Sequence, residues 1–496
     1  MDDDSNARLN EELRATLVEL RQVIVQLRED LTKQAAENAE LKRMLFGKRS
    51  ERVVPIEREI KKATPEADSA RQAIAKERRA LRAQQKRELP EVEIVHPVSP
   101  SAEQCDRCGG NFRDLGEGDV SYEYEFVPGR FIRRKHIRKK RVCQCGCTII
   151  SADPPERVAD GVQYGPGLHA HVVVAKCCDS LPLYRQAKGL QRQGVPISDS
   201  SLGDMFHRTA EICRPLYDVL LKEIAASGYV NADETPLSVQ STGKTRRAFI
   251  WTFIGAGHVA FSFSPSRSGS TPATILAGNT GFLQVDAYGG YNGVCTPERW
   301  VRVGCLAHVR RYFFKAKETA PEAAQDALAR ILSIYQVEHE AETLGIVGTG
   351  AHLELRERKA KPILEAFQTW ILQQQAAHTP KSPMGKALTY ALNAWPTLLV
   401  YLSDAKLRPD NNAAEGQLRI IALGRKNFLF VGNDVAGENL AVLQSLVATC
   451  QAHDVNPHSY LADVLVRSRS HPASRIRELL PDQWKRLFGD DAASTA

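Results

Sequence analysis

The sequence predicts a multidomain protein of the α+β class. Three observations support this prediction: an apolar heptad repeat near the N-terminus, two groups of closely spaced cysteines, and a change of apolar period from 3.6 to 2 residues after residue 228. The chain has 496 residues, which is enough for about three or four domains. Its hydrophobic share of 43% is ordinary for a protein that buries real cores.

Basic residues give the chain a net charge of +7 and gather in its first 150 positions. The stretch "RFIRRKHIRKKR" carries eight of them in twelve positions: Arg130, Arg133, Arg134, Lys135, Arg138, Lys139, Lys140 and Arg141. Such a run is typical of a site for a polyanion, and nucleic acid is the commonest polyanion. We therefore expect this run to bind DNA. The alternative is a solvated strand.

The composition also indicates a compartment. No uninterrupted apolar run approaches the ~18 residues that a membrane helix requires. The N-terminus, "MDDDSNARLN", is acidic and polar, which is not typical of a signal peptide. Eleven cysteines without a secretory signal indicate reduced thiols and metal binding rather than disulfides. We expect a cytoplasmic protein with no membrane contact.

Residues 1–47 are expected to form a coiled-coil helix. Apolar residues alternate at spacings of four and three from Leu13 onward, and Asn38 occupies an a position. The strict, narrow seam predicts a homodimer through residues 13–45, and a buried Asn at an a position favours a parallel two-stranded form. One long amphipathic helix folded back on its own domain is the alternative. Residues 48–100 are predicted to be a charged linker with a helical segment.

Residues 101–152 contain cysteines in two groups, "CDRCGG" and "CQCGC". These cysteines are Cys105, Cys108, Cys143, Cys145 and Cys147. Four thiolates suit a tetrahedral zinc ion, and the strand-like stretches between the groups are compatible with a zinc ribbon. We expect one structural Zn²⁺ held by four of the five, and which of the last three serve stays open. The basic run leads directly into the second group, so that bound metal would fix its side chains in space.

Residues 153–227 are predicted to be helical. The pattern indicates one helix, a turn at Gly194, a capping residue near Ser198 and a second helix. This arrangement is similar to a helix–turn–helix DNA-binding pair. A plain helical hairpin fits the pattern equally well.

Residues 228–317 show the alternation typical of β-strands. Three strand-like segments separated by turns predict an antiparallel meander: "GYVNADETPLSV", "RRAFIWTFIGAG" and "HVAFSFSPS". A short helix ("TPATILAG"), two further strands ("GFLQVDAYGGYNGV" and "WVRVGCLAH") and the helix "VRRYFFKAKE" follow. Together they predict a mixed sheet of ribonuclease H type, in which the first and fourth strands are neighbours.

Two aspartates lie in apolar surroundings on this predicted sheet. Asp233 falls in the middle of the first strand and Asp286 at the end of the fourth. A carboxylate there costs several kcal/mol unless it is paired, hydrogen-bonded or bound to metal. Neighbouring strands bring both acids to one edge, where Mg²⁺ is the natural partner because it prefers oxygen ligands and keeps positions for phosphate and water. Two capped strand-end aspartates are the alternative.

Glu415 lies in "DNNAAEGQLR", residues 410–419, on what the pattern predicts as the first turn of a helix. Taken alone, an acidic residue at this position is ordinary, because capping residues and the helix dipole favour it. The residues around it therefore decide whether Glu415 has a function.

Four stretches occur in the order "ADETP", "VDAYGGYN", "CLAHVRRYFF" and "DNNAAEGQLRIIALGRKNFLFVGND". Together they resemble the IS66 family of bacterial insertion-sequence transposases. The N-terminal repeat ending in "LFGKRSE" and the cysteine module match the layout of that family, so that the resemblance covers nearly the whole chain. The second cysteine group departs from the C-x-x-C that is common in the family, which leaves the fourth zinc ligand open.

By this resemblance, Asp233, Asp286 and Glu415 correspond to the acidic triad of DDE transposases. Asp410 is the expected helix cap, which leaves Glu415 free to point toward the sheet edge. The chemistry implied is phosphoryl transfer with two Mg²⁺ or Mn²⁺ ions, and Asp233 is the candidate bridge between them. The family's activity is cleavage at the terminal repeats of the transposon, followed by transfer of the 3′-hydroxyl into target DNA.

The resemblance also divides the core and suggests partners. Residues 318–405 are expected to be a helical insertion between the second and third acids. Residues 406–470 would then complete the core with the helix of Glu415, and residues 471–496 would form a C-terminal tail. IS66-type elements often encode two further small proteins, which are candidate partners beside DNA.

Several residues near the acids are candidates for auxiliary roles. His308 could position water or contact phosphate, although a lone histidine is more often structural. Arg310 and Arg311 are candidates for neutralising DNA, and Arg425 and Lys426 for contacting phosphates. For the last two a solvated turn is the alternative.

Three rival functions share some of these features. A catalytically inactive DNA-binding regulator would keep the zipper, the zinc module and the basic run, but all three acids are present in context. A ribonuclease H-like nuclease without strand transfer would share the core, although the zipper and DNA-binding modules favour paired-end synapsis. A zinc-dependent hydrolase would need histidine or carboxylate ligands with an open site, and a cysteine-only cluster argues against it.

Overall fold

The computed structural model describes residues 76, 77, 79, 80, 84, 131–142, 144, 147, 149–296 and 298–493, with side chains as far as residue 489. The chain divides into two compact units, Glu57–Lys135 and a larger one formed by the rest. In the smaller unit, residues 76, 77, 79, 80 and 84 of the predicted linker are helical. The predicted coiled coil and Cys105, Cys108, Cys143 and Cys145 lie outside the described residues.

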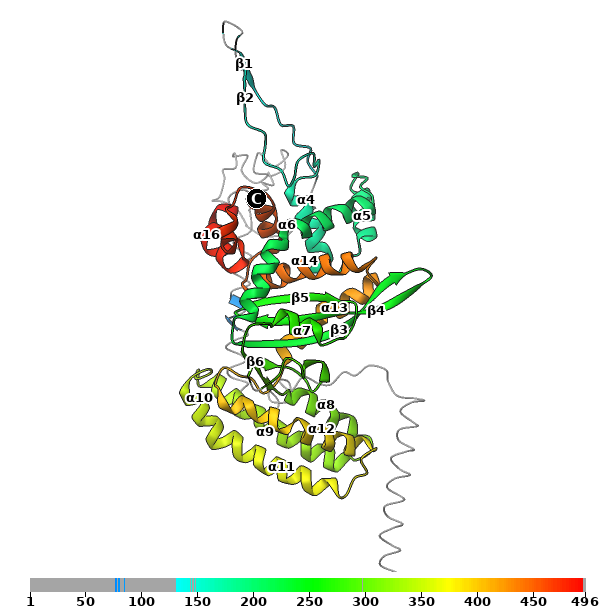
Figure 1. Cartoon of the computed structure of the whole chain (residues 1–496), viewed down its shortest axis with the longest axis vertical. Helices are drawn as coiled ribbons and strands as arrows, with labels where there is room; N and C mark the ends of the chain where they lie inside the picture. The colour runs from blue at the N-terminus through cyan, green and yellow to red at the C-terminus, as the bar shows by residue number, and fades with distance from the viewer. Residues whose placement is uncertain are drawn as a thin grey trace, which may run out of the picture. The chain divides into compact units, whose positions relative to one another are not determined.

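The centre of the larger unit is a five-stranded mixed sheet (Figure 1). Its strands, in the spatial order β5-β4-β3-β6-β7, are β5 His258–Ser264, β4 Lys244–Gly255, β3 Tyr229–Ser241, β6 Gly281–Gln284 and β7 Trp300–Val303. β3, β4 and β5 are antiparallel, whereas β6 and β7 run parallel to β3. The α+β class and the mixed sheet predicted from the sequence are confirmed, including the neighbouring first and fourth strands.

Helices α6 (Asp199–Ala225) and α14 (Asp434–Ala452) pack against each other and against the edge strand β5. Hydroxyl groups on α14 satisfy the edge of that strand, because Ser445 accepts the N–H of Phe261 and Thr449 accepts the N–H of Val259. A covered edge cannot pair with another chain. The buried polar residues of α14 thus close one side of the sheet.

The helix pair predicted in the segment 153–227 is present. Gly194 (φ +79°) follows α5 (Leu183–Arg192), and the side chain of Ser198 accepts the N–H of Ser201 as the N-cap of α6. A preceding helix, α4 (Pro166–Cys177), also packs on α6. Because α6 contributes its apolar face to the main core, the second helix of the pair is a core helix.

Between β7 and the last part of the core in the sequence, the chain forms a layer of helices. This layer lies beside the β6 side of the sheet (Figure 1). Its members are α8 Leu306–Ala316, α9 Pro321–Thr343, α10 Gly350–Leu355, the π-helix η3 Arg356–Ala360, α11 Lys361–Gln375, α12 Pro383–Leu398 and η4 Leu399–Ser403. Arg356, only 1% exposed, donates to both oxygens of Glu338 and to the carbonyls of Tyr401, Asp404 and Leu407. The guanidinium therefore fixes the segment that leads back to the core.

The segment expected to form the C-terminal tail, 471–496, is largely helical as far as residue 493. After α15 (Pro457–Arg467), η5 (Ala473–Leu479) and α16 (Pro481–Ala493) bury Leu479, Leu480 and Trp484 in the main core. Polar residues at both ends of this segment gave no indication in the sequence that its apolar centre is buried.

Among the described residues, no helix combines the length and the apolar composition required to span a lipid bilayer.

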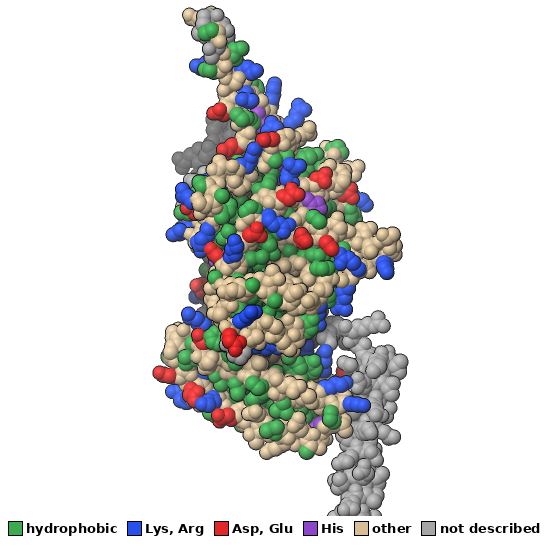
Figure 2. Space-filling view, viewed as in Figure 1, with side chains coloured by type: hydrophobic (Ala, Val, Ile, Leu, Met, Phe, Trp, Pro, Cys, Tyr) green, Lys and Arg blue, Asp and Glu red, His purple; other side chains and the backbone are tan. Residues whose placement is uncertain are grey.

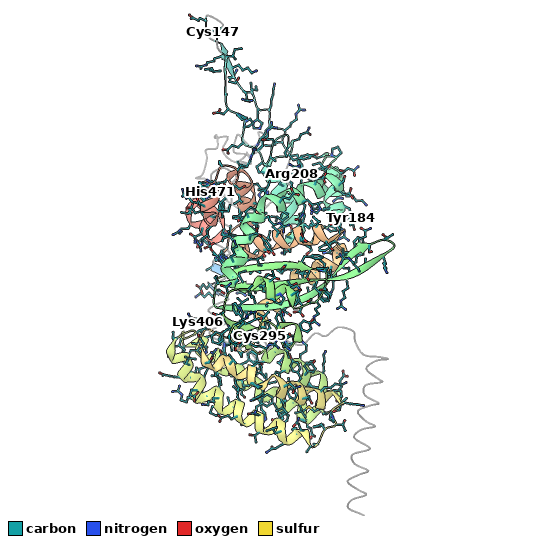
Figure 3. The ribbon with its side chains drawn as sticks, viewed as in Figure 1. Cys147, Tyr184, Arg208, Cys295, Lys406 and His471 are labelled. Atoms are coloured by element: carbon teal, nitrogen blue, oxygen red, sulfur yellow. The ribbon has the colours of Figure 1, made fainter. Side chains whose placement is uncertain are left out.

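A two-stranded hairpin carries the described end of the cysteine module. β1 (Lys140–Val142) and β2 (Ile149–Ser151) are antiparallel, and Cys147 lies at the tip between them (Figure 3). Lys and Arg side chains recur along this hairpin (Figure 2). The described basic residues of the run, among them Arg138 and Arg141, are exposed, as contact with a polyanion requires.

Candidate active site

The candidate site is a cleft beside β3, where the short strand β6 has ended. Along β3, strand β6 pairs only with Tyr229–Asn231, and farther along the same edge Val239 forms a bridge with Val431. An open cleft of about 340 Å³ lies against the interval between these pairings. It is lined by Asp233, Glu234, Thr235, Arg267, Asp286, His308, Arg311, Glu415, Leu418, Arg419 and Ala422.

Asp233 and Asp286 enter the cleft from neighbouring strands. Asp233 is within β3, and its Oδ1 accepts the N–H of Glu234 at 2.9 Å. Asp286 lies two residues beyond the end of β6, and its Oδ1 accepts the N–H of Tyr288 at 2.9 Å. The pairing of β3 with β6 therefore brings both acids to one sheet edge, where the sequence placed them.

Glu415 reaches the same cleft because the start of α13 (Asn412–Phe428) is fixed to β3. The buried side chain of Asn411 donates to the carbonyl of Ala232 at 2.8 Å, directly before Asp233. Asp410 accepts the N–H of Asn412, the first residue of the helix, at 3.0 Å. The three residues of "DNN" thus dock and cap the helix and leave Glu415 to face the cleft.

The surroundings of Glu415 differ from those of a solvated helix charge. Its side chain is 18% exposed, and Arg311 on α8 donates to Oε2 at 2.8 Å. Oε1 is buried and accepts no hydrogen bond from the described residues, although Nδ1 of His308 lies 3.5 Å away. A buried carboxylate oxygen without a donor is costly unless a cation completes its environment.

His308 lies between two of the acids. Its Nε2 is 4.0 Å from Oδ2 of Asp286, and its Nδ1 is 3.5 Å from Glu415. Burial lowers the pKa of His308 below its ordinary value, an effect that the Glu415 carboxylate opposes. The imidazole is therefore neutral near pH 7 and can donate one N–H to a neighbouring carboxylate.

The electrostatics of the cleft fit a divalent cation. Burial raises the pKa of Asp233 to about 8, with further contributions from the negative charges of Glu234, Glu415 and Asp286. Carboxylates in such proximity cannot all ionise without compensating positive charge. Three oxygen-bearing side chains around an open cleft are the ligands that Mg²⁺ prefers, so the residues present fit this ion.

Glu234 is a fourth acid in the cleft that the sequence analysis did not single out. Its side chain is only 2% exposed; Arg267 donates to Oε1 at 2.8 Å and the Tyr291 hydroxyl donates to Oε2 at 2.8 Å. Arg267 was also missed, as was Arg419, which is exposed one turn after Glu415. The adjacency of Glu234 to Asp233 was a signal, but the partners come from loops that carry no periodic pattern.

The predicted basic residues near the acids have different positions. Arg311 faces the cleft, whereas Arg310 is 5% exposed and buried. The prediction that Arg310 neutralises DNA is therefore corrected, because a buried guanidinium does not reach a DNA backbone. Arg425 and Lys426 lie in the last turn of α13 rather than in a solvated turn, and Arg425 donates to the carbonyl of Pro236 while Lys426 is exposed.

Three carboxylates from separate elements, converging at the end of a mixed sheet, define a protein with a candidate divalent-cation site in an arginine-lined cleft. Residues 161–439 match the family described as transposase IS66, residues 445–481 match the IS66 C-terminal element, and residues 102–146 match the zinc-finger binding domain of transposase IS66. The first match covers more than half of the chain. This chain belongs to the IS66 family of transposases.

The chain is also similar, over nearly its full length, to two uncharacterized proteins. An uncharacterized protein of Sinorhizobium fredii, y4jD, is 30% identical over 514 residues, which cover 96% of this chain and 98% of the relative. A second uncharacterized protein of that organism, y4hP, is 29% identical over 487 residues, which cover 90% of this chain and 87% of the relative. The zinc-finger match includes Cys105, Cys108, Cys143 and Cys145 and ends one residue before Cys147.

Proposed function

We propose that this protein is the DDE transposase of an IS66-like insertion sequence, binding the terminal repeats of the element and catalysing DNA cleavage and strand transfer. The observation that carries the proposal is the convergence of Asp233, Asp286 and Glu415 in one open cleft. Membership of the IS66 family supports it. The strand order, with β6 and β7 added in parallel to a three-stranded meander, supports a ribonuclease H-like core.

In this proposal Asp233, Asp286 and Glu415 would hold two Mg²⁺ or Mn²⁺ ions. Bound ions of this kind lower the pKa of an attacking water or 3′-hydroxyl and stabilise the leaving oxygen. The raised pKa of Asp233 and the donor-free Oε1 of Glu415 are the observations that favour cation binding.

The remaining side chains of the cleft orient these ligands. Arg311 donates a hydrogen bond to one oxygen of Glu415, and His308 lies 3.5 Å from Glu415 and 4.0 Å from Asp286. Preorganised positions of this kind account for much of the rate enhancement in phosphoryl transfer. The exposed Arg419 is placed to meet a backbone phosphate.

The other modules would bring the DNA ends to this site. We propose that one zinc ion, held by the cysteine module, fixes the basic run for binding of the terminal repeats, and that a coiled coil over residues 13–45 pairs two protomers. The zinc-finger match supports the first part, and the strict heptad repeat supports the second. Accessory proteins encoded by the element are further candidate partners.

The test is cleavage of labelled DNA carrying the element's terminal repeat, with Mg²⁺, by the unaltered protein and by Glu415→Gln. We expect Glu415→Gln to lower the cleavage rate by more than about 100-fold, because the amide removes a negative ligand while keeping the shape of the side chain. Glu438→Gln is the matched control, since Glu438 is an exposed acid at the start of α14, outside the cleft. This control should cleave at the normal rate.

The products distinguish the rival functions. Cleavage followed by joining to a target plasmid supports the transposase. Cleavage without joining indicates a ribonuclease H-like nuclease, and binding without cleavage by the unaltered protein indicates a DNA-binding regulator. Equal cleavage by Glu415→Gln would show that Glu415 is an ordinary helix-start charge.

A further inference from the structure

Arg267 is a cationic feature of the cleft that is separate from Arg311 and Arg419. It lies in the loop between β5 and α7 (Ser270–Ile275), lines the cleft, and keeps 45% of its side chain exposed. Arg311 comes from α8 and is bound to Glu415. The loop supplies Arg267, and the helices α8 and α13 supply Arg311 and Arg419, to a cleft whose acids would otherwise repel a phosphate.

Glu234 is paired with Arg267, and both of its carboxylate oxygens accept hydrogen bonds. Its Oε1 accepts from the guanidinium and its Oε2 accepts from the Tyr291 hydroxyl, so both oxygens have a donor. By contrast, Oε1 of Glu415 has none among the described residues. A carboxylate that is 2% exposed and fully hydrogen-bonded serves to fix its partner in one position.

Tyr288 holds Arg267 from a second side. The guanidinium carbon is 3.8 Å from the centre of the Tyr288 ring, and the Tyr288 hydroxyl donates to the carbonyl of Arg267 at 2.7 Å. The backbone N–H of the same tyrosine binds Asp286 at 2.9 Å. Arg267 is thus linked through one residue to a member of the acidic triad.

Glycines also allow the loop of Arg267 to approach the segment that follows Asp286 closely. A Cβ at Gly269 would lie 2.0 Å from the carbonyl oxygen of Gly290, so only glycine permits this approach. A Cβ at Gly290 would in turn lie 2.3 Å from the ring of Tyr288. The guanidinium is therefore held at a fixed place beside the acids while remaining partly open to the cleft.

We propose that Arg267 binds a phosphate of the DNA strand in the cleft, with Glu234 and Tyr288 as its positioning residues. A planar guanidinium binds a phosphate through two parallel hydrogen bonds, and prior fixation by a carboxylate and a ring reduces the entropy lost on binding. Next to acids that repel a polyanion, a fixed cation sets where the strand lies. The inference rests on the proposed function for the identity of the ligand, which is DNA.

The test is a methylphosphonate scan. A labelled duplex carrying the terminal repeat is made with single neutral methylphosphonates at successive phosphates around the cleavage point, and binding is measured with Ca²⁺ in place of Mg²⁺. We expect the unaltered protein to bind about 10- to 100-fold more weakly when the phosphate that Arg267 contacts is neutral. In a variant without this arginine, the neutral phosphate should cause no further weakening at that one position.

The variants are chosen to keep the fold. Arg267→Ala alone leaves Glu234 buried without its cation, so the double variant Arg267→Ala/Glu234→Gln is measured beside it. Arg267→Lys should restore part of the affinity, since it keeps the charge but not the two parallel donors. Arg299→Ala, which removes an exposed arginine outside the cleft, should keep the pattern of the unaltered protein.

A double variant that keeps the sensitivity of the unaltered protein at every phosphate would overturn the inference. This binding result is separate from the proposed function, which is tested by cleavage in Mg²⁺. If the unaltered protein shows the Arg267-dependent binding pattern but does not cleave DNA, the phosphate site is supported and the transposase proposal is contradicted.

Discussion

Glu415 illustrates that an acidic residue at a helix start is either a solvated charge or part of a site, depending on the residues that surround it. An acid in the first turn of a helix is stabilised by the helix dipole wherever it occurs. Here it is also mostly buried, bound by Arg311 and close to His308. These interactions come from α8, more than a hundred positions earlier, so the local sequence could not distinguish the two cases. The motifs upstream supplied the distinction.

The pKa of Asp233 gives a prediction for the dependence of stability on pH. This pKa is raised to about 8 by burial first and by nearby carboxylates. Between about pH 4 and pH 8 the folded protein therefore holds a proton that the unfolded chain has released, and stability without metal falls as pH rises through this range. Mg²⁺ binds the ionised form, so the increase in Tm on adding Mg²⁺ should be larger at pH 8 than at pH 6.

Scanning fluorimetry at the two pH values, with and without Mg²⁺, measures this difference. Asp233→Asn should remove most of the pH dependence of the Mg²⁺ effect. Asp326→Asn, which alters an exposed acid paired with Arg330 on α9, should leave it unchanged. A Mg²⁺ effect of equal size at both pH values would contradict the assignment of Asp233 as the raised group.

At the scale of elements, the helical layer is joined to the core through Arg356. Its guanidinium binds Glu338 on α9 and three carbonyls of the segment 401–407, after which the chain reaches Asn411 and the start of α13. The buried cation therefore belongs to the support of Glu415, although it lies outside the cleft.

Arg356→Ala should destabilise the helical layer by about 3–5 kcal/mol, because it leaves Glu338 and three carbonyls without their donor. Urea denaturation followed by tryptophan fluorescence measures this destabilisation, since Trp370 and Trp395 lie in the same layer. Lys359→Ala is the matched control in the same π-helix, where an exposed pair with Glu340 contributes less than about 1 kcal/mol. Equal midpoints for the two variants would contradict the role of Arg356.

The elements themselves were largely predictable from the sequence, whereas their packing partners were not. Alternation of apolar residues predicted the meander and the strand before Asp286, and turn residues predicted the break between α5 and α6. Periodicity reports whether a segment is helical or extended, but not which partner it meets. For that reason the burial of Arg310 and the folded segment 471–493 were not foreseen.

The candidate site divides in the same way. Asp233, Asp286 and Glu415 were identified from their motifs, and the structure brings them to one cleft. Glu234 was not predicted as a site residue, because the adjacent Asp233 already accounted for the motif. Arg267 lies in a loop, and its partners are 33 positions before it and 21 positions after it. Pairings at such distances leave no signal in a single sequence.

At the scale of the whole molecule, the regions matched to the family do not all form separate bodies. The C-terminal element includes α15 and η5, and its Leu461, Leu465 and Leu479 belong to the same apolar core as the sheet. The zinc-finger match, in contrast, ends before this core begins. The expected division is therefore between a metal-dependent DNA-binding part and a core that folds without zinc.

Removing zinc should weaken DNA binding while leaving the core folded. A zinc-selective chelator, with Mg²⁺ held constant, should reduce the salt dependence of binding by about one unit for each phosphate that the basic run no longer neutralises. Circular dichroism should show that the helices of the core remain. Cys105→Ser should reproduce the effect and Cys295→Ser, which alters a cysteine outside the module, should not. Unchanged DNA binding after chelation would contradict the role given to the module.

The helical layer also has a consequence for synthesis of the protein. Glu415 follows Asp286 by 129 positions, most of them in this layer, so the third acid leaves the ribosome long after the first two. Asn411 must then bind the backbone of β3, made about 180 positions earlier, before the cleft is complete. Under the proposed function, a nascent chain would therefore carry its N-terminal DNA-binding modules before its cleft is complete.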